Sequence, residues 1–592
     1  MSKTKPQGHP NRRPLADFRA DGRLVMLAGM AVLIGTGGTA AAWVLLKLIA
    51  LVTNLVWFGR IDSGGVSLAH IARTPWVVIA PMAGGLVIGL MARSGSEKIR
   101  GHGIPEAIEA ILIGGSRMSL KVAILKPISS AISIGTGGPF GAEGPIIMTG
   151  GAIGSLFSQL FHLSAAERKT LLVAGAASGM TAIFGTPVAA VLLAVELLLF
   201  EWRPRSFIPV ATAAITAVVL RPGLFGMGPL FPFASDPILP WWGLLACAGL
   251  GVAAGVLSIL FTTVLYALED GFETLPLHWM WWPMLGGGVV GLGGLIEPRA
   301  LGVGYDVIAD LLTGHLVIAA VVSILLVKAV IWLVALSSGT SGGVLAPLLI
   351  LGGAMGWLVG LALPGAPGFW ALLGMAAMLG GTMRAPLTGA IFAVELTGDV
   401  RMLAPLLAAS AAAYAVTVLF LKRSILTEKI ARRGQHITRE YGIDPYELTR
   451  VSEIMTRDVD VLSADLSVAD AMTALTTGEH QAYPVLDAKG RPVGLVSRAD
   501  ALQWAIGDEN KGSKLGECVS GESLVIVHPD DVTALAIDLM LVTDRGRLLV
   551  TDPTTGILVG LLTRKDVLQV RALVTRSEND RETYFAARRN PL

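Results

Sequence analysis

Long apolar segments separated by short polar turns fill most of the chain between Leu24 and Leu421. About twenty apolar residues cross the hydrocarbon core of a bilayer, so the first segment, Leu24–Val52, is long enough to span it with tilt. The later segments are Trp76–Met91, Leu171–Phe200, Phe207–Leu220, Trp241–Leu268, Met280–Ile296, Leu316–Leu336, Gly343–Leu363, Phe369–Gly380, Pro386–Leu396 and Met402–Leu421. Several are short or interrupted by Gly and Pro, which predicts broken helices.

The composition agrees with this pattern. Only 15% of the 592 residues are charged, whereas about 25% is usual for soluble domains. We therefore expect a polytopic α-helical membrane protein with a soluble C-terminal part. The basic residues 1–23 predict a cytoplasmic N-terminus followed by a retained span. No basic cluster indicates nucleic-acid binding, and two cysteines, Cys247 and Cys518, predict no disulfide framework.

One stretch, Gly135–Gly154, contains eight glycines in twenty residues and a single carboxylate, Glu143. Pro145 suits the first turn of a helix, so we expect a helix to start near Gly144. A helix N-terminus attracts anions, and a carboxylate at membrane depth marks a functional site by default. The alternative is a glycine-rich packing segment that carries a chance glutamate.

An internal repeat divides the membrane part. The equivalent residues are Lys126 and Lys328, Pro145 and Pro347, Pro187 and Pro386, and Glu196 and Glu395. The first two pairs are 202 residues apart and the last two are 199 residues apart. A duplicated unit with paired Gly/Pro-interrupted segments predicts a transport site at the repeat interface. Spacing alone leaves open whether the repeat is inverted.

After residue 434 the pattern changes to that of a soluble α/β protein. Residues 435–450 read as a charged linker, 451–510 and 511–575 as two copies of one module, and 576–592 as a tail. Each copy contains a strand, a turn, a second strand and a helix start. Ser497 and Thr563 occupy the helix N-cap positions, with Asp500 and Asp566 three residues later. These residues either cap helices or bind a ligand.

The motifs resemble those of the chloride channel and chloride/proton exchanger family. "GHGIP" (Gly101–Pro105), "GAEGP" (Gly141–Pro145) and "GVLAP" (Gly343–Pro347) occur in the family's order, and "GVGYDVI", "RAPLTG" and "SILTEKIARRG" are also similar to family stretches. The resemblance covers residues 24–434, and 451–575 resemble a pair of CBS modules. It implies a homodimer in the plasma (inner) membrane, with a pore between inverted repeats in each subunit and both termini cytoplasmic.

The resemblance also implies roles for individual residues. Glu143 would be the gate and proton acceptor. The anion would be bound by His102, Gly103, Ile104, Ala142, Gly144, Val344, Leu345 and Leu426. Three of these depart from the family pattern: His102 replaces a Ser, Leu426 replaces a Tyr, and Ala142 replaces a basic residue. A proton-relay glutamate would fall at Leu197, one position from Glu196, which we interpret as a structural carboxylate like Glu395.

Chloride or a similar small anion is therefore the expected cargo, with channel-like or weakly proton-coupled transport favoured. The alternative is a proton-coupled chloride antiporter. No HExxH, catalytic serine motif or paired His/Asp/Glu cluster supports an enzyme. A cation transporter would need several intramembrane carboxylates, and Glu143 is nearly alone. We expect no metal site.

No cofactor is required for such transport. The resemblance of the tail to CBS modules implies a regulatory adenine-nucleotide site for ATP, ADP or AMP. Its residues would be Tyr483, Ser497, Asp500, Thr563 and Asp566. The rival hypothesis is a tail that stabilises a dimer and binds no ligand.

Overall fold

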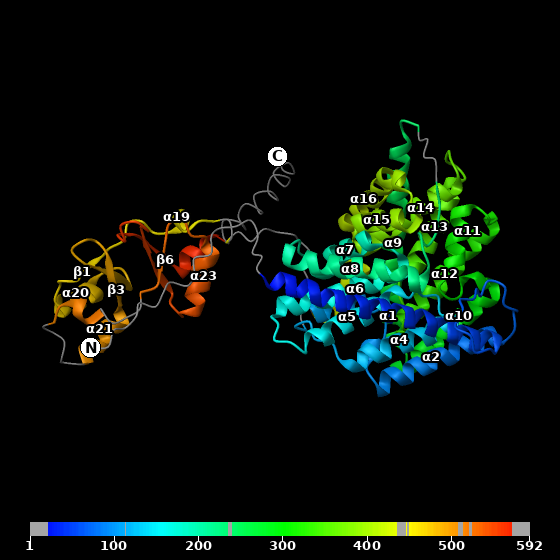
Figure 1. Cartoon of the computed structure of the whole chain (residues 1–592), viewed down its shortest axis with the longest axis horizontal. Helices are drawn as coiled ribbons and strands as arrows, with labels where there is room; N and C mark the ends of the chain where they lie inside the picture. Colours follow the sequence, from blue (N-terminus) through cyan, green and yellow to red (C-terminus); the bar gives the residue numbers. More distant parts are fainter. Residues whose placement is uncertain are drawn as a thin grey trace, which may run out of the picture. The chain divides into compact units, whose positions relative to one another are not determined.

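The computed structural model describes residues 22–112, 114–234, 240–434, 446, 449–506, 513–519 and 524–570. Nearly all of the predicted N-terminal segment, most of the linker and the C-terminal tail lie outside the described residues. The chain divides at residue 440 into two compact units, which are described separately (Figure 1). The first unit is helical, and the second contains the strands.

The first unit contains helices that are long and apolar enough to cross a membrane. These are α1 (Arg23–Phe58), α2 (Trp76–Ser94), α8 (Pro204–Phe225), α9 (Gly243–Glu273), α12 (Ile318–Ser337) and the stretch Val400–Arg432, which holds α16 (Leu403–Phe420) and α17 (Ile425–Arg432). Shorter helices lie between them: α3 (Ile104–Leu112), α4 (Leu120–Gly135), α5 (Glu143–Ser158), α6 (Ala165–Phe184), α7 (Pro187–Leu193), α10 (Trp282–Ile296), α11 (Tyr305–Thr313), α13 (Leu345–Gly360), α14 (Pro367–Met383) and α15 (Pro386–Thr397). The mixture of long and short helices confirms the predicted broken-helix architecture.

The predicted single segment Leu171–Phe200 is wrong, because the chain breaks inside it. Helix α6 ends at Gly185, whose φ of 71° is left-handed and suits glycine. Pro187 then starts α7, which continues into the π-helical turn η2 (Ala194–Leu199). Most other predicted segments differ from the observed helices by a few residues at their ends.

Glycines allow the short helices to pack backbone to backbone. A Cβ atom on Gly150 of α5 would lie 2.3 Å from the carbonyl oxygen of Gly175 in α6. A Cβ atom on Gly352 of α13 would lie at the same distance from the carbonyl oxygen of Gly374 in α14. Small residues permit such close helix approaches in membranes. The α5–α6 and α13–α14 pairs are therefore equivalent parts of the two repeats.

Reciprocal hydrogen bonds join the repeats. Gly141 donates its N–H to Gly343 O at 3.2 Å, and Gly343 donates to Gly141 O at 2.8 Å. When equivalent residues of two units bond to each other in both directions, a two-fold axis relates the units. This local axis passes between the starts of α5 and α13.

The second unit holds two three-stranded sheets of the same topology. One contains β1 (Leu462–Ser463), β2 (Ala482–Leu486) and β3 (Pro492–Ser497), and the other contains β4 (Ile526–Val527), β5 (Arg547–Thr551) and β6 (Leu558–Thr563). In each sheet the first pair of strands is parallel and the second pair antiparallel. Helices α20 (Val468–Thr477), α21 (Arg498–Ile506) and α23 (Thr533–Val542) accompany the sheets. The strand–turn–strand–helix pattern expected from Ala482 onward is confirmed.

The two modules exchange their leading segments. Helix α19 (Val451–Ile454) precedes the first sheet, yet Val451 packs in the core around β4–β6 and donates its N–H to Asp531 O at 2.9 Å. Helix α22 (Leu515–Val519) precedes the second sheet, yet Leu515 packs in the core around β1–β3. Each module therefore completes the core of the other.

Candidate functional site

Glu143 is the first residue of α5 and is fully buried. Its Oε1 accepts hydrogen bonds from the backbone N–H groups of Leu345, at 2.5 Å, and Ala346, at 3.1 Å. These amides belong to the first turn of α13, in the other repeat. The N-terminus of a helix presents free N–H groups and positive potential, so it binds anions. The Glu143 carboxylate thus occupies a place where a dissolved anion could bind.

Only glycine fits beside this carboxylate. A Cβ atom on Gly343 would lie 2.6 Å from Glu143 Oε1, and one on Gly141 would meet Glu143 Oε2 even more closely. A Cβ atom on Gly144 would lie 2.1 Å from the carbonyl oxygen of His102. The three glycine-containing motifs, which lie far apart in the sequence, therefore converge on Glu143.

The loop before α3 carries His102 and is shaped by two left-handed glycines. Gly101 has a φ of 76° and Gly103 a φ of 88°. The Lys126 ammonium donates to Gly101 O at 2.7 Å and to Ile99 O at 2.9 Å, which holds the loop in place. His102 is buried, and its Nδ1 has no hydrogen-bond partner among the described residues. Its ring is therefore available to a ligand.

Leu426 lies in the first turn of α17 and is fully buried. Its side chain cannot donate a hydrogen bond. The sequence analysis missed a hydroxyl nearby, because Tyr266 of α9 donates to Ile425 O at 2.6 Å. Ion pairs join α17 to α3, with Lys429 at 3.4 Å and Arg433 at 3.2 Å from Glu106 Oε1. These pairs fix the end of α17 that leads toward the linker.

Leu197, at the expected position of a relay acid, is fully buried within η2. Glu196 instead accepts hydrogen bonds from the N–H groups of Leu387, at 3.3 Å, and Thr388, at 2.9 Å. It therefore caps the N-terminus of α15. Its repeat mate Glu395 caps α7 in the same way, and these contacts agree with the structural role expected for both.

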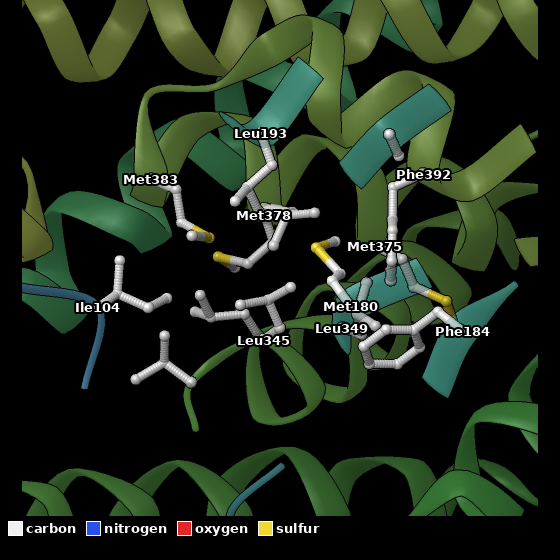
Figure 2. Packing of buried hydrophobic residues seen from close by; sticks show 14 of the residues in the cluster. Ile104, Met180, Phe184, Leu193, Leu345, Leu349, Met375, Met378, Met383 and Phe392 are labelled. Atoms are coloured by element: carbon white, nitrogen blue, oxygen red, sulfur yellow. The ribbon is translucent and has the colours of Figure 1, made fainter. Parts of the chain in front are cut away.

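An apolar cluster surrounds this region. Figure 2 shows Ile104 near Met378, Met383 and Leu345, with Phe184 and Phe392 farther along the same cluster. The rings of Phe184 and Phe392 are 5.1 Å apart. Such surroundings exclude water and strengthen the interaction of an anion with helix amides. Within the described ranges, no group of three or more His, Cys, Asp and Glu side chains is placed to hold a metal ion.

Two further groups near Glu143 were missed by the sequence analysis. Lys328 of α12 is fully buried and interacts electrostatically with Glu143, as does the hydroxyl of Tyr305 at the start of α11. Both residues lie in patterns that the sequence shows, since Lys328 is the repeat mate of Lys126 and Tyr305 lies in "GVGYDVI". Neither pattern predicts that Lys328 and Tyr305 interact with Glu143.

The second unit builds the same cap twice. Asp500 Oδ2 accepts from the N–H and the hydroxyl of Ser497, both at 2.7 Å. Asp566 Oδ2 accepts from the N–H of Thr563, at 2.8 Å, and from its hydroxyl, at 2.7 Å. Tyr483 lies in β2, and its hydroxyl accepts from His480 N at 3.2 Å. Both aspartates thus take part in a helix cap, and each uses one carboxylate oxygen, Oδ2, for it.

Comparisons with known proteins agree with this geometry. Residues 84–418 match the family described as "Voltage gated chloride channel", and residues 451–507 and 518–573 each match the CBS domain. The chain is 28% identical over 396 residues to a "Putative chloride channel protein ClcB-like" from Ralstonia nicotianae, covering 65% of this chain and 92% of the relative. It is 31% identical over 372 residues to the "H(+)/Cl(-) exchange transporter ClcA" of Klebsiella pneumoniae (strain 342), covering 58% and 76%.

Solved structures show the same fold. A slow cyanobacterial Cl-/H+ antiporter superposes with a TM-score of 0.60 at 23% identity, over 70% of this chain and 99% of the other. A eukaryotic CLC transporter superposes with a TM-score of 0.58 at 20% identity, over 92% and 98%. With the matched family spanning more than half of the sequence, the chain belongs to the CLC family of chloride channels and transporters and carries a C-terminal pair of CBS domains.

Proposed function

We propose that this protein transports chloride or a similar small anion through a path gated by Glu143. The observation that carries the proposal is the binding of the Glu143 carboxylate to the Leu345 and Ala346 amides. Those amides suit any small anion, and His102, Gly103, Ile104, Ala142, Gly144, Val344 and Leu426 complete the proposed binding region. Transport needs no reacting centre, and members of this family are transporters rather than enzymes.

The gate would work by competition. An ionised carboxylate binds the amides and excludes the anion, whereas a protonated one loses its charge and much of its affinity. Acidification should therefore raise anion flux. The surroundings are apolar, so the amides are the main groups that attract an anion there. The carboxylate and the anion therefore compete directly for the same amides.

The test is anion efflux from liposomes reconstituted with the purified protein, measured over a range of pH. Glu143→Gln imitates the protonated carboxyl and should give high flux with a weakened pH dependence. Glu97→Gln, at an exposed carboxylate before α3, is the matched control and should behave as the wild type. A Glu143→Gln protein that keeps the wild-type pH profile would place the gate elsewhere.

We favour channel-like or weakly coupled transport, because an apolar Leu197 cannot carry a proton. The alternative, proton-coupled antiport, is supported by the exchange activity in the names of several relatives and by the antiporter among the structural neighbours. Simultaneous recording of anion and proton flux separates the two.

For the second unit we propose adenine-nucleotide sensing. Asp500 and Asp566 each use one carboxylate oxygen for the helix cap, so the other oxygen could accept from ribose hydroxyls. Tyr483 would help hold the base, while the helix starts after Ser497 and Thr563 favour phosphate. A nucleotide changes flux only if it binds the two pore states differently. The rival remains a dimer-stabilising tail without a ligand.

We also propose a homodimer in the plasma (inner) membrane, with both termini in the cytoplasm. Exposed apolar side chains on α8 and α16, including Val219 and Leu419, can face lipid or a second subunit. Cysteine cross-linking between copies along these helices tests the dimer. Labelling of intact cells with an impermeant reagent tests the orientation.

A further inference from the structure

Two buried polar atoms near the proposed gate lack partners. Among the described residues, neither Glu143 Oε2 nor the hydroxyl oxygen of Tyr305 has a hydrogen-bond partner. A buried polar group without a partner destabilises a folded protein, so such groups call for an explanation. One explanation is that the atom finds its partner in another state of the protein.

One buried cation, the Lys328 ammonium, lies within electrostatic reach of Glu143 and donates to Gly302 O at 2.9 Å just before α11. The Tyr305 hydroxyl and the Lys328 ammonium each interact electrostatically with Glu143, and Lys328 also interacts with Asp306. A Cβ atom on Gly304 would lie 2.8 Å from Ile350 Cδ1 and 3.6 Å from Lys328 Nζ. The start of α11 therefore packs against α13, whose first amides hold the Glu143 carboxylate.

Aromatic rings hold Tyr305 in place. Its ring centroid is 6.2 Å from that of Phe184 and 5.9 Å from that of Phe231, both with edge-to-face geometry. Phe184 also contacts Phe392 and belongs to the cluster that contains Leu345 (Figure 2). The Tyr305 ring thus packs among aromatic side chains at the edge of this apolar cluster, and these contacts orient its hydroxyl.

Resting on the proposed gate, we propose that the Tyr305 hydroxyl receives the Glu143 carboxyl when the gate opens. The protonated carboxyl leaves the Leu345 and Ala346 amides and bonds to Tyr305, which can both donate and accept. Tyr305 is therefore a positioning residue that stabilises the open state.

The experiment is pH-dependent anion efflux from liposomes with full-length Tyr305→Phe, which removes one oxygen atom. Loss of one hydrogen bond should lower the open fraction at a given pH about two- to tenfold. The activation midpoint should accordingly move about 0.3 to 1 pH unit toward acid. Tyr414→Phe makes the same chemical change at an exposed position on α16 and should leave the midpoint unchanged.

Two more measurements separate this role from a structural one. Because the Tyr305 hydroxyl bonds to none of the residues that the structure describes, Tyr305→Phe should not lower the melting temperature. In a Glu143→Ala background there is no carboxyl to receive, so Tyr305→Phe should have no further effect on flux. An unchanged midpoint in Tyr305→Phe, or an undiminished effect in the Glu143→Ala background, overturns the inference.

The same variants distinguish failure of the proposed gate from failure of the proposed role of Tyr305. If Glu143→Ala keeps the wild-type pH dependence, the proposed gate itself is wrong, and the inference falls with it. If Glu143→Ala abolishes the pH dependence while Tyr305→Phe matches the wild type, the gate stands and only the role of Tyr305 is rejected.

Discussion

Glu196 accepts hydrogen bonds from both the backbone N–H and the hydroxyl of Thr388, at 2.9 and 2.6 Å, although the two residues lie in different repeats. The mirror contact joins Glu395 to the N–H groups of Val188, at 3.0 Å, and Ala189, at 2.8 Å. Each repeat thus caps a short helix of the other. Without these carboxylates, the first N–H groups of α7 and α15 would lose their acceptors.

Glu196→Ala is expected to destabilise the protein by about 1–2 kcal/mol, as the loss of a helix cap does. Glu196→Gln keeps an acceptor oxygen and should cost less. Thermal unfolding in detergent measures both effects, with Glu97→Gln as the exposed control. Normal stability of Glu196→Gln combined with a loss of proton flux would instead identify Glu196 as a proton carrier.

His102→Ser is expected to change anion selectivity or the pH response of flux. The buried imidazole has no hydrogen-bond partner for Nδ1 among the described residues, and its burial disfavours the charged form, so the ring acts there as a neutral donor or acceptor. A serine keeps one hydrogen-bond donor and removes the bulk of the imidazole ring. Flux of chloride, nitrate and fluoride over a range of pH measures the change, and His162→Ser at an exposed position serves as control. Wild-type behaviour of an intact His102→Ser protein would mean that the ring only packs.

Proton coupling is expected to be weak or absent in the wild-type protein. Leu197 is fully buried and cannot exchange a proton, and it occupies the position where the family resemblance implies a relay acid. In liposomes with a chloride gradient and no proton gradient, a proton-coupled antiporter drives protons uphill. Stoichiometric uphill proton movement would contradict this expectation and establish the antiporter alternative.

Nucleotide binding by the second unit is expected to depend on Asp500 and Asp566. Replacement by Asn keeps one carbonyl oxygen for the cap but leaves none for ribose, so affinity should fall while the fold is retained. Isothermal titration of the full-length protein with ATP, ADP and AMP measures this, and Asp544→Asn at an exposed position is the control. No heat with any of the three up to millimolar concentration would remove the sensor hypothesis.

Local chemistry was sufficient to predict much of this protein from its sequence. Dense glycine and proline disfavour continuous helices, so the interrupted spans and the helix start at Glu143 were predictable within a residue or two. The repeat of Lys126 at Lys328 and the two S/T-x-x-D caps followed from spacing. These features depend on residues close together in the chain or on direct comparison of two stretches.

Tertiary packing decided which distant groups meet. The amides that bind Glu143 lie 202 and 203 residues away, and nothing in the local pattern links them. The exchange of α19 and α22 between modules and the approach of Tyr305 and Lys328 to Glu143 are of the same kind. Such contacts depend on how whole helices and modules pack against one another. That packing is a property of the complete folded chain and cannot be read from any one stretch of sequence.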